Sequence, residues 1–438
     1  MTTVFNNSTA AASDASCSTI AEALTQTRDW RTPVAMINPS TMHLWPEEPQ
    51  MDGTDRIKFG ATLELGSTFR KQLWYSVDLE ASKFVTQSCD PFVLGAFFIA
   101  AANGADLLVH GQVSPSLLRN LIDFQNAWKS WWQHGFSARS IDADKEAEDL
   151  PAAGAPRAIC AYSGGVDSNF TIYRHKLIDI GRQKRNIEAA LLIHGLDLPL
   201  KQNERFERIT ANSKQLLNSV GINLITLKTN FREINPDWNN THGAALASAL
   251  MLFKKQFSEG IIASTYSYDQ LLLPWGSNPI SDPLMSSKSF EIVHDAPHWA
   301  RFSKLAALSH WPAAYDKLRV CFELDAEERN CGKCFKCICT WLGCKLAKVE
   351  APASLPAPTA EAILALRNVP AADMFGLDNF GELLENADVP APILHAFKRC
   401  LNHNRRRHLF ERKCSNGKPD IWYRFASKVH SRLSRYFT

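Results

Sequence analysis

Residues 158–171 read Ala158-Ile-Cys-Ala-Tyr-Ser-Gly-Gly-Val-Asp-Ser-Asn-Phe-Thr171. The apolar start predicts a short buried strand that ends at the Ser-Gly-Gly turn, and the apolar spacing of residues 169–180 predicts a helix. Backbone N–H groups of such a turn and of the first helical turn point at one place, where the helix dipole adds positive potential. The stretch therefore predicts an anion site at the start of a helix.

The side chains of this turn suit a phosphate ligand. Gly164 and Gly165 permit positive φ angles and a close approach of the backbone. Ser163 and Ser168 add hydroxyl donors, and Asp167 could hold Mg²⁺ beside the phosphates. No lysine follows the glycines, so the turn does not have the Walker pattern.

The hexapeptide Ser163-Gly-Gly-Val166-Asp-Ser168 resembles the Ser-Gly-Gly-x-Asp-Ser loop of the PP-loop ATP pyrophosphatases. Those enzymes cleave ATP between the α and β phosphates, leave AMP on an acceptor oxygen and release pyrophosphate. The resemblance implies that residues 163–168 bind ATP and Mg²⁺. A chance glycine-rich turn between a strand and a helix is the alternative.

Composition indicates a soluble protein with a sizeable core. The chain has 438 residues, of which 45% are hydrophobic and 21% charged, enough for two or three domains. Its longest uncharged apolar stretch, Pro91 to Ala105, is too short to span a bilayer. The first residues lack the pattern of a secretory signal, and eleven cysteines then suggest a reducing compartment. We expect a cytoplasmic protein without a membrane segment.

Four regions are expected along the chain. Residues 1–25 are rich in Ser, Thr, Ala and Asn and are predicted to be disordered. Residues 26–150 contain alternating strands, such as 56–65 and 72–77, together with helices, and predict an α+β domain. Residues 151–348 predict the PP-loop domain, joined to the first by a linker at 142–156, and residues 349–438 a helical, basic region.

After the turn, the pattern alternates between strand and helix. Apolar runs at 189–197, 222–227 and 260–264 predict strands, with helices at 203–220 and 242–256 between them. This alternation predicts an α/β fold with a doubly wound parallel sheet, which binds ligands at the carboxyl ends of its strands. His194 and Ser264 lie at such ends and are candidate ATP contacts, although His194 could equally be a structural histidine.

Two further segments are candidates for chemistry. Residues 266–287 form a long stretch dense in Pro, Gly, Ser and Asn, which is either the acceptor-substrate loop or a structural excursion. Arg301 and Lys304 then fall on one face of a predicted helix. They could stabilise charge on the departing pyrophosphate, or they could be a solvated surface pair.

A cysteine cluster follows. Cys321 precedes Cys331-Gly-Lys-Cys334-Phe-Lys-Cys337, so three thiols recur at a spacing of two residues and a fourth is near. Four thiolates suit tetrahedral Zn²⁺, although an iron–sulfur cluster or redox cysteines would use the same residues. We expect a structural Zn²⁺ site. Cys339 and Cys344, on the helix that follows, are expected to be packing residues, with Cys339 as an alternative ligand.

The glycine-rich loop followed by this cysteine spacing is similar to the 7-cyano-7-deazaguanine synthase (QueC-like) branch of PP-loop enzymes. In that branch ATP adenylates a 7-deazaguanine carboxylate, ammonia converts it to an amide, and a second adenylation then gives the nitrile. The resemblance covers about residues 157–348, and this chain adds about 150 residues before them and about 90 after. It therefore also resembles the larger QueC-like proteins of Qat-type anti-phage systems, where related chemistry would join a deazaguanine to a protein partner.

The resemblance implies a ligase that forms AMP and pyrophosphate from ATP and uses a carboxylate substrate and a nitrogen donor. Asp167, Arg301 and Lys304 would be its catalytic residues. A tRNA-modifying enzyme of the same superfamily and a nucleotide-binding scaffold without turnover are the alternatives. From Lys398 onward, twelve Lys and Arg residues oppose Glu411 and Asp420, with Trp422 and Tyr423 among them. This tail could bind nucleic acid or pack on its own domain.

Overall fold

The structure is a computed structural model that describes residues 40–414 except 133, 134, 236, 322, 324–328, 370–373, 375–379 and 382, and no side chain after residue 410. The segment predicted to be disordered, residues 1–25, and the aromatic part of the basic tail lie outside the described residues. Within them, no helix has both the length and the apolarity needed to cross a bilayer.

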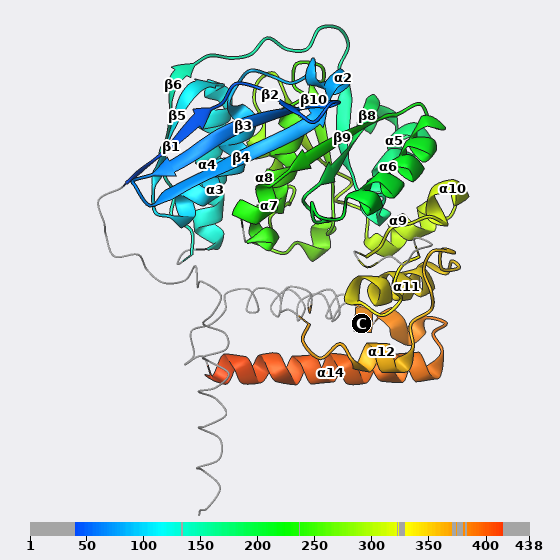
Figure 1. The fold of residues 1–438 in the computed structure, drawn as a ribbon. Coiled ribbons are helices and arrows are strands. Elements are labelled where there is room, and N and C mark those ends of the chain that lie inside the picture. The colour runs from blue at the N-terminus through cyan, green and yellow to red at the C-terminus, as the bar shows by residue number, and fades with distance from the viewer. Residues whose placement is uncertain are drawn as a thin grey trace, which may run out of the picture.

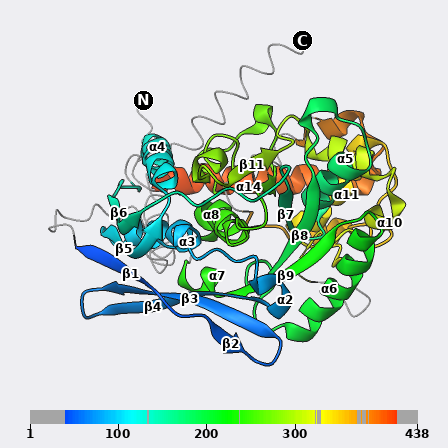
Figure 2. The ribbon, with the colours of Figure 1, turned by 90° about the horizontal axis from the view of Figure 1, so that it is seen from above.

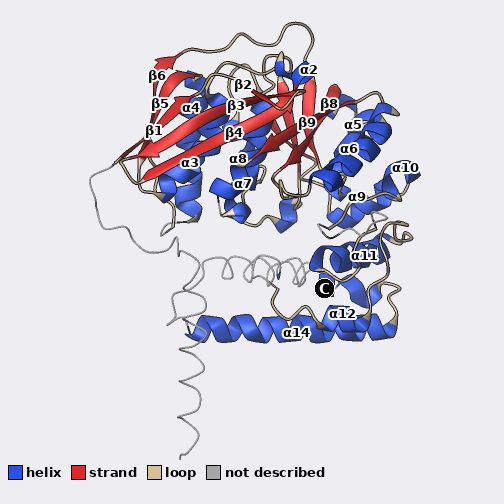
Figure 3. Cartoon of the chain, viewed as in Figure 1, coloured by secondary structure: helices blue, strands red, loops and turns tan. Residues whose placement is uncertain are grey.

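One mostly parallel sheet of eleven strands forms the centre of the molecule (Figures 1 and 3), so the fold is α/β and compatible with a doubly wound arrangement. The spatial order is β11-β10-β7-β8-β9-β4-β3-β1-β5-β6, with β2 paired to β3. The strands are β1 (Thr41–Pro46), β2 (Gln50–Asp52), β3 (Arg56–Leu65), β4 (Phe69–Asp78), β5 (Asp106–Val113), β6 (Ile141–Glu146), β7 (Ala158–Tyr162), β8 (Ile187–His194), β9 (Asn223–Thr229), β10 (Glu259–Ala263) and β11 (Glu291–Asp295).

Twelve α-helices are present in the described part of the chain. They are α2 (Leu79–Ser82), α3 (Asp90–Ala102), α4 (Pro115–Trp131), α5 (Val166–Lys176), α6 (Asn203–Asn218), α7 (Phe231–Ile234), α8 (Trp238–Met251), α9 (Arg301–Leu308), α10 (Pro312–Tyr315), α11 (Phe335–Ala347), α12 (Ala360–Leu364) and α14 (Ala391–Cys414). Figure 2 shows α3 and α8 inside the curve of the sheet and α6 outside it.

The sheet continues across the predicted domain boundary at residue 150. β4 pairs antiparallel with β9, with Val77 opposite Leu227, so the β3–β4 hairpin extends the parallel strands β7–β9. Arg56 reinforces this junction because its buried guanidinium donates to Ser76 on β4 and to Thr226 on β9. The domain limits stay predictions.

The predicted linker is partly a strand. Residues 141–146 form β6, which pairs with β5 at the edge of the sheet. Its side chains are mostly exposed, as edge strands allow. Because many of them are charged, the composition of this segment predicted a linker and not a strand.

A second core joins strands β7 and β8 and helices α5 and α6 to the C-terminal helices. Phe170 of α5, Leu305 of α9, Trp341 of α11 and Phe397 of α14 belong to one buried cluster. Figure 1 shows α11, α12 and α14 together at one end of the sheet. The predicted packing of the basic segment is present where it is described: His408 donates to the carbonyl of Val369, and buried Asn404 donates to that of Leu366.

Candidate anion site and metal centre

The turn between β7 and α5 has the backbone of an anion site. Gly164 has φ of +73°, a conformation that favours glycine, and Gly165 is the N-cap of α5. A Cβ atom on Gly165 would lie 3.3 Å from the carbonyl oxygen of Arg319, so a side chain there would be crowded. The helix starts at Val166, three residues before the sequence pattern predicted, and this places Asp167 and Ser168 in its first turn.

The turn is fixed from below by two buried side chains. Tyr162 donates through its hydroxyl to Oδ1 of Asn169, and Nδ2 of Asn169 donates to the carbonyl of Gly164, both at 3.0 Å. Across the turn, the hydroxyls of Ser163 and Ser168 lie 3.3 Å apart. These contacts hold the loop in place.

Helix α9 brings both predicted cations to Asp167. The ammonium of Lys304, whose side chain is 1% exposed, lies 3.2 Å from Oδ1 of Asp167. Nη1 of Arg301 lies 3.6 Å from Oδ2 of the same carboxylate, and Nε of Arg301 is buried without a hydrogen-bond partner among the described residues. The three residues predicted to be catalytic are therefore together.

The predicted ATP contacts at the other strand ends are both buried but differ in their hydrogen-bond partners. Ser264 is buried after β10, where its hydroxyl accepts from Lys304 at 2.9 Å and donates to the carbonyl of Ala296. His194 is also buried, donates through Nε2 to the carbonyl of Pro199 and stacks on Phe206. Burial lowers the pKa of His194. Ser264 thus contacts the cation cluster, whereas His194 is packed within the fold.

Sequence reasoning missed Arg319, which lies directly on the phosphate turn. Its backbone N–H donates to the carbonyl of Gly164 at 2.9 Å, and its Nε donates to the carbonyl of Ser163 at 2.7 Å. Burial lowers the pKa of Arg319, and the Asp197 carboxylate opposes that shift. Arg205 and Lys336 are within electrostatic range of Arg319, and the Asp197 carboxylate is within range of both Arg319 and Lys336.

The segment proposed as an acceptor loop is ordered by Asp282. Oδ2 of this buried carboxylate accepts from Ser277 at 2.6 Å and from Nδ1 of His294 at 2.8 Å. This hydrogen bond leaves Nε2 of His294 as the remaining ring nitrogen, and that atom is buried without a partner among the described residues. The segment is thus a built part of the fold, and His294 joins it through a contact with Asp282 that the sequence did not reveal.

The four predicted metal ligands are assembled. The sulfur atoms of Cys321, Cys331, Cys334 and Cys337 all lie within 4.8 Å of one another, so this group could hold a metal such as zinc. Two backbone N–H groups already point at sulfur: that of Cys331 at Cys321 and that of Cys334 at Cys331, both at 3.4 Å. Gly332, with φ of +67°, forms the tight turn between the ligands.

The thiols also perturb one another. Hydrogen bonds from Cys334 and Cys337 lower the pKa of Cys321 to about 2. The hydrogen bond with Cys321 raises the pKa of Cys334 to about 12, and hydrogen bonds with Cys321 and Cys334 raise the pKa of Cys337. One thiolate thus forms readily while its neighbours resist ionisation, and a divalent cation would relieve that repulsion.

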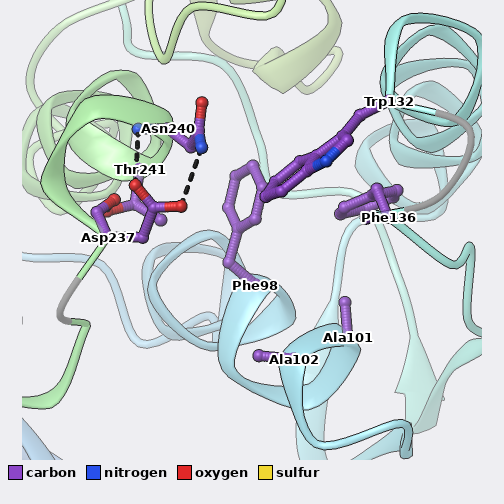
Figure 4. Close-up of a pocket in the computed structure, with 9 residues that line it drawn as sticks. Phe98, Ala101, Ala102, Trp132, Phe136, Asp237, Asn240 and Thr241 are labelled. Atoms are coloured by element: carbon purple, nitrogen blue, oxygen red, sulfur yellow. Dashed lines mark hydrogen bonds between the residues drawn. The ribbon is translucent and has the colours of Figure 1, made fainter. Parts of the chain in front are cut away.

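A small pocket of about 10 Å³ lies between the end of α3, the residues that follow α4 and the start of α8. In Figure 4, Phe98, Trp132 and Phe136 face it from one side and Asp237, Asn240 and Thr241 from the other. The polar residues already serve the start of α8, because Asp237 accepts from both nitrogens of Asn240. Its lining shares no residue with the phosphate turn or the sulfur cluster.

A scan against protein-family models found no match, and searches of curated proteins and of solved structures found none either.

Proposed function

We propose that this chain is an ATP-dependent, AMP-forming ligase with QueC-like chemistry, acting on a carboxylate of the 7-deazaguanine type. The supporting observation is the convergence of Arg301, Lys304 and Arg319 on the turn at the start of α5. A glycine turn at a helix N-terminus binds anions through its backbone, and cations around it neutralise phosphate charge.

The residues present fit a triphosphate. Nε of Arg301 and Nη2 of Arg205 are buried nitrogens without a hydrogen-bond partner among the described residues, as expected for donors reserved for a ligand. Asp167 would hold Mg²⁺ beside the phosphates, although it also pairs with Lys304 in this conformation. Mg²⁺ would supply charge neutralisation as the α–β phosphate bond breaks.

In the proposed reaction, a carboxylate oxygen of the substrate attacks the α-phosphorus and the bond to the β-phosphate oxygen breaks, which releases pyrophosphate. Arg301 and Lys304 would stabilise the negative charge that gathers on the leaving group. A nitrogen nucleophile then attacks the acyl carbon, AMP departs with the C–O bonding electrons, and the nitrogen loses a proton. The product is an amide, formed on ammonia or on a protein amine.

The test is pyrophosphate release together with product mass, using ATP, Mg²⁺ and 7-carboxy-7-deazaguanine with and without ammonia. Asp167→Ala should abolish release, and Asp123→Ala, at an exposed position on α4, is the matched control. Release that survives in Asp167→Ala would refute the assignment. ATP binding without pyrophosphate release would show that 7-carboxy-7-deazaguanine is not the substrate. The assay would then be repeated with protein or tRNA acceptors.

A further inference from the structure

The segment Leu318–Cys321 connects the phosphate turn to the sulfur cluster. At one end, Arg319 bonds the carbonyls of Ser163 and Gly164 through its side chain and its backbone. At the other end, two residues later, Cys321 is one of the four clustered thiols. A displacement of Cys321 would therefore be transmitted to Arg319 over a very short length of chain.

Asn330 fixes this segment from the side of the metal site. Its side chain is buried, next to Cys331, and its Oδ1 accepts from the backbone N–H of Val320 at 2.7 Å and of Cys321 at 3.1 Å. Its Nδ2 donates to the carbonyl of Leu318 at 2.8 Å. The segment that carries Arg319 is thus hydrogen-bonded to Asn330, the residue before the metal ligand Cys331.

The terminal nitrogens of Arg319 are available to a ligand. Nε is used by the carbonyl of Ser163, while Nη1 and Nη2 make no hydrogen bond to any residue that the structure describes. A guanidinium anchored in this way presents a planar pair of donors, which suits bidentate binding of phosphate oxygens. Lys336, between Cys334 and Cys337, adds a second cation within electrostatic range of Arg319 and Arg301.

We propose that a metal ion in the Cys321, Cys331, Cys334 and Cys337 site sets the affinity for the triphosphate, because it fixes Arg319 as a phosphate-binding residue. This inference rests on the proposed use of ATP. Since coupling between two binding equilibria is reciprocal, ATP must also strengthen metal retention by the same factor. The four-cysteine site then positions Arg319 for nucleotide binding in addition to stabilising the fold.

The experiment is calorimetric titration of Mg²⁺-ATP into zinc-loaded and zinc-depleted full-length protein, for the wild type, Arg319→Gln and Lys333→Gln. Removal of zinc should weaken ATP binding about tenfold in the wild type, within the usual range of site-to-site coupling. With zinc present, Arg319→Gln should bind ATP about tenfold more weakly than the wild type. Removal of zinc should then weaken ATP binding by this variant only a little further. Lys333 is an exposed cation between the ligands Cys331 and Cys334, so Lys333→Gln should bind ATP like the wild type.

A second measurement covers the case in which depleted protein unfolds. The equilibrium constant for zinc transfer from folded, loaded protein to a coloured chelator should fall about tenfold when ATP is bound, and should not change in Arg319→Gln. Equal ATP affinity with and without zinc, or equal transfer equilibria with and without ATP, would overturn the inference. Absence of ATP binding to loaded wild-type protein would instead refute the proposed function.

Discussion

Lys304 joins Asp167 at the start of α5 to Ser264 at the end of β10, through contacts of 3.2 Å to the carboxylate and 2.9 Å to the hydroxyl. Its side chain is 1% exposed, so its charge is held in a medium where electrostatic interactions are strong. A buried ammonium beside an anion-binding turn stabilises incoming negative charge more than an exposed one can. We therefore predict that Lys304 contributes strongly to nucleotide binding.

Lys304→Met should weaken ATP binding about 30-fold, equivalent to ~2 kcal/mol for a lost charge-assisted hydrogen bond. The change keeps the length and apolar volume of the side chain, so the packing of α9 should persist. Titration calorimetry measures the affinity, and near-ultraviolet circular dichroism reports the fold. Lys317→Met, at an exposed lysine, is the control. A Kd unchanged in Lys304→Met would contradict the prediction.

Gly164→Ala should reduce both stability and nucleotide affinity. The φ angle of +73° costs a residue with a Cβ atom about 1 kcal/mol, and the strained turn must also present its N–H groups to phosphate. Gly221 has φ of +70° and open space around it, in the loop before β9. Gly221→Ala should therefore show the same loss in urea unfolding but bind ATP normally. Equal effects on binding in the two variants would count against a special role for the phosphate turn.

The order of strands and helices around the turn could be predicted because apolar runs and glycine turns act locally. The predicted strands at 56–65 and at the start of residues 158–171 are present, and the Arg56–Leu65 strand pairs antiparallel with its neighbour. The pairing of β4 with β9 could not be predicted, since no local pattern specifies which strand edges meet.

The candidate site shows the same division between local and long-range information. The turn, the cysteine cluster and the pair Arg301/Lys304 each have a spacing that indicates their chemistry. Arg319 has no such signal: it stands alone before Cys321, and only the hydrogen bonds of the folded chain bring it to Ser163. His294 is likewise one histidine in a strand until Asp282 is found at its Nδ1.

The metal site gives a prediction with an internal control. Cys337→Ser should lower bound zinc from about one ion per chain to almost none, because a tetrahedral site of four thiolates loses a ligand. Cys339 lies on the same helix but is not among the four clustered thiols, so Cys339→Ser should retain the metal. Metal analysis by mass spectrometry checks both. Loss of zinc from Cys339→Ser would show instead that Cys339 is a metal ligand.

Asp295, at the end of β11, should contribute to stability in a pH-dependent way. Burial raises the pKa of its carboxyl, but hydrogen bonds and charges from His175, Arg174 and Thr171 outweigh burial and lower the pKa below 3.8. A folded-state pKa below the unfolded value contributes stability that is fully present above pH 3.8 and is lost as the pH falls through the folded pKa.

Asp295→Asn should therefore lower the free energy of unfolding by about 3–5 kcal/mol at neutral pH, because it leaves the buried Arg174 without its counter-charge. Between pH 7 and pH 5 the difference from the wild type should stay constant, and it should narrow below pH 3.8 as the wild-type carboxylate takes up its proton. Urea unfolding at several pH values, with Asp123→Asn as the exposed control, measures it. A difference that does not narrow in acid would show that Asp295 acts through its shape and hydrogen bonds, and that its charge contributes nothing to stability.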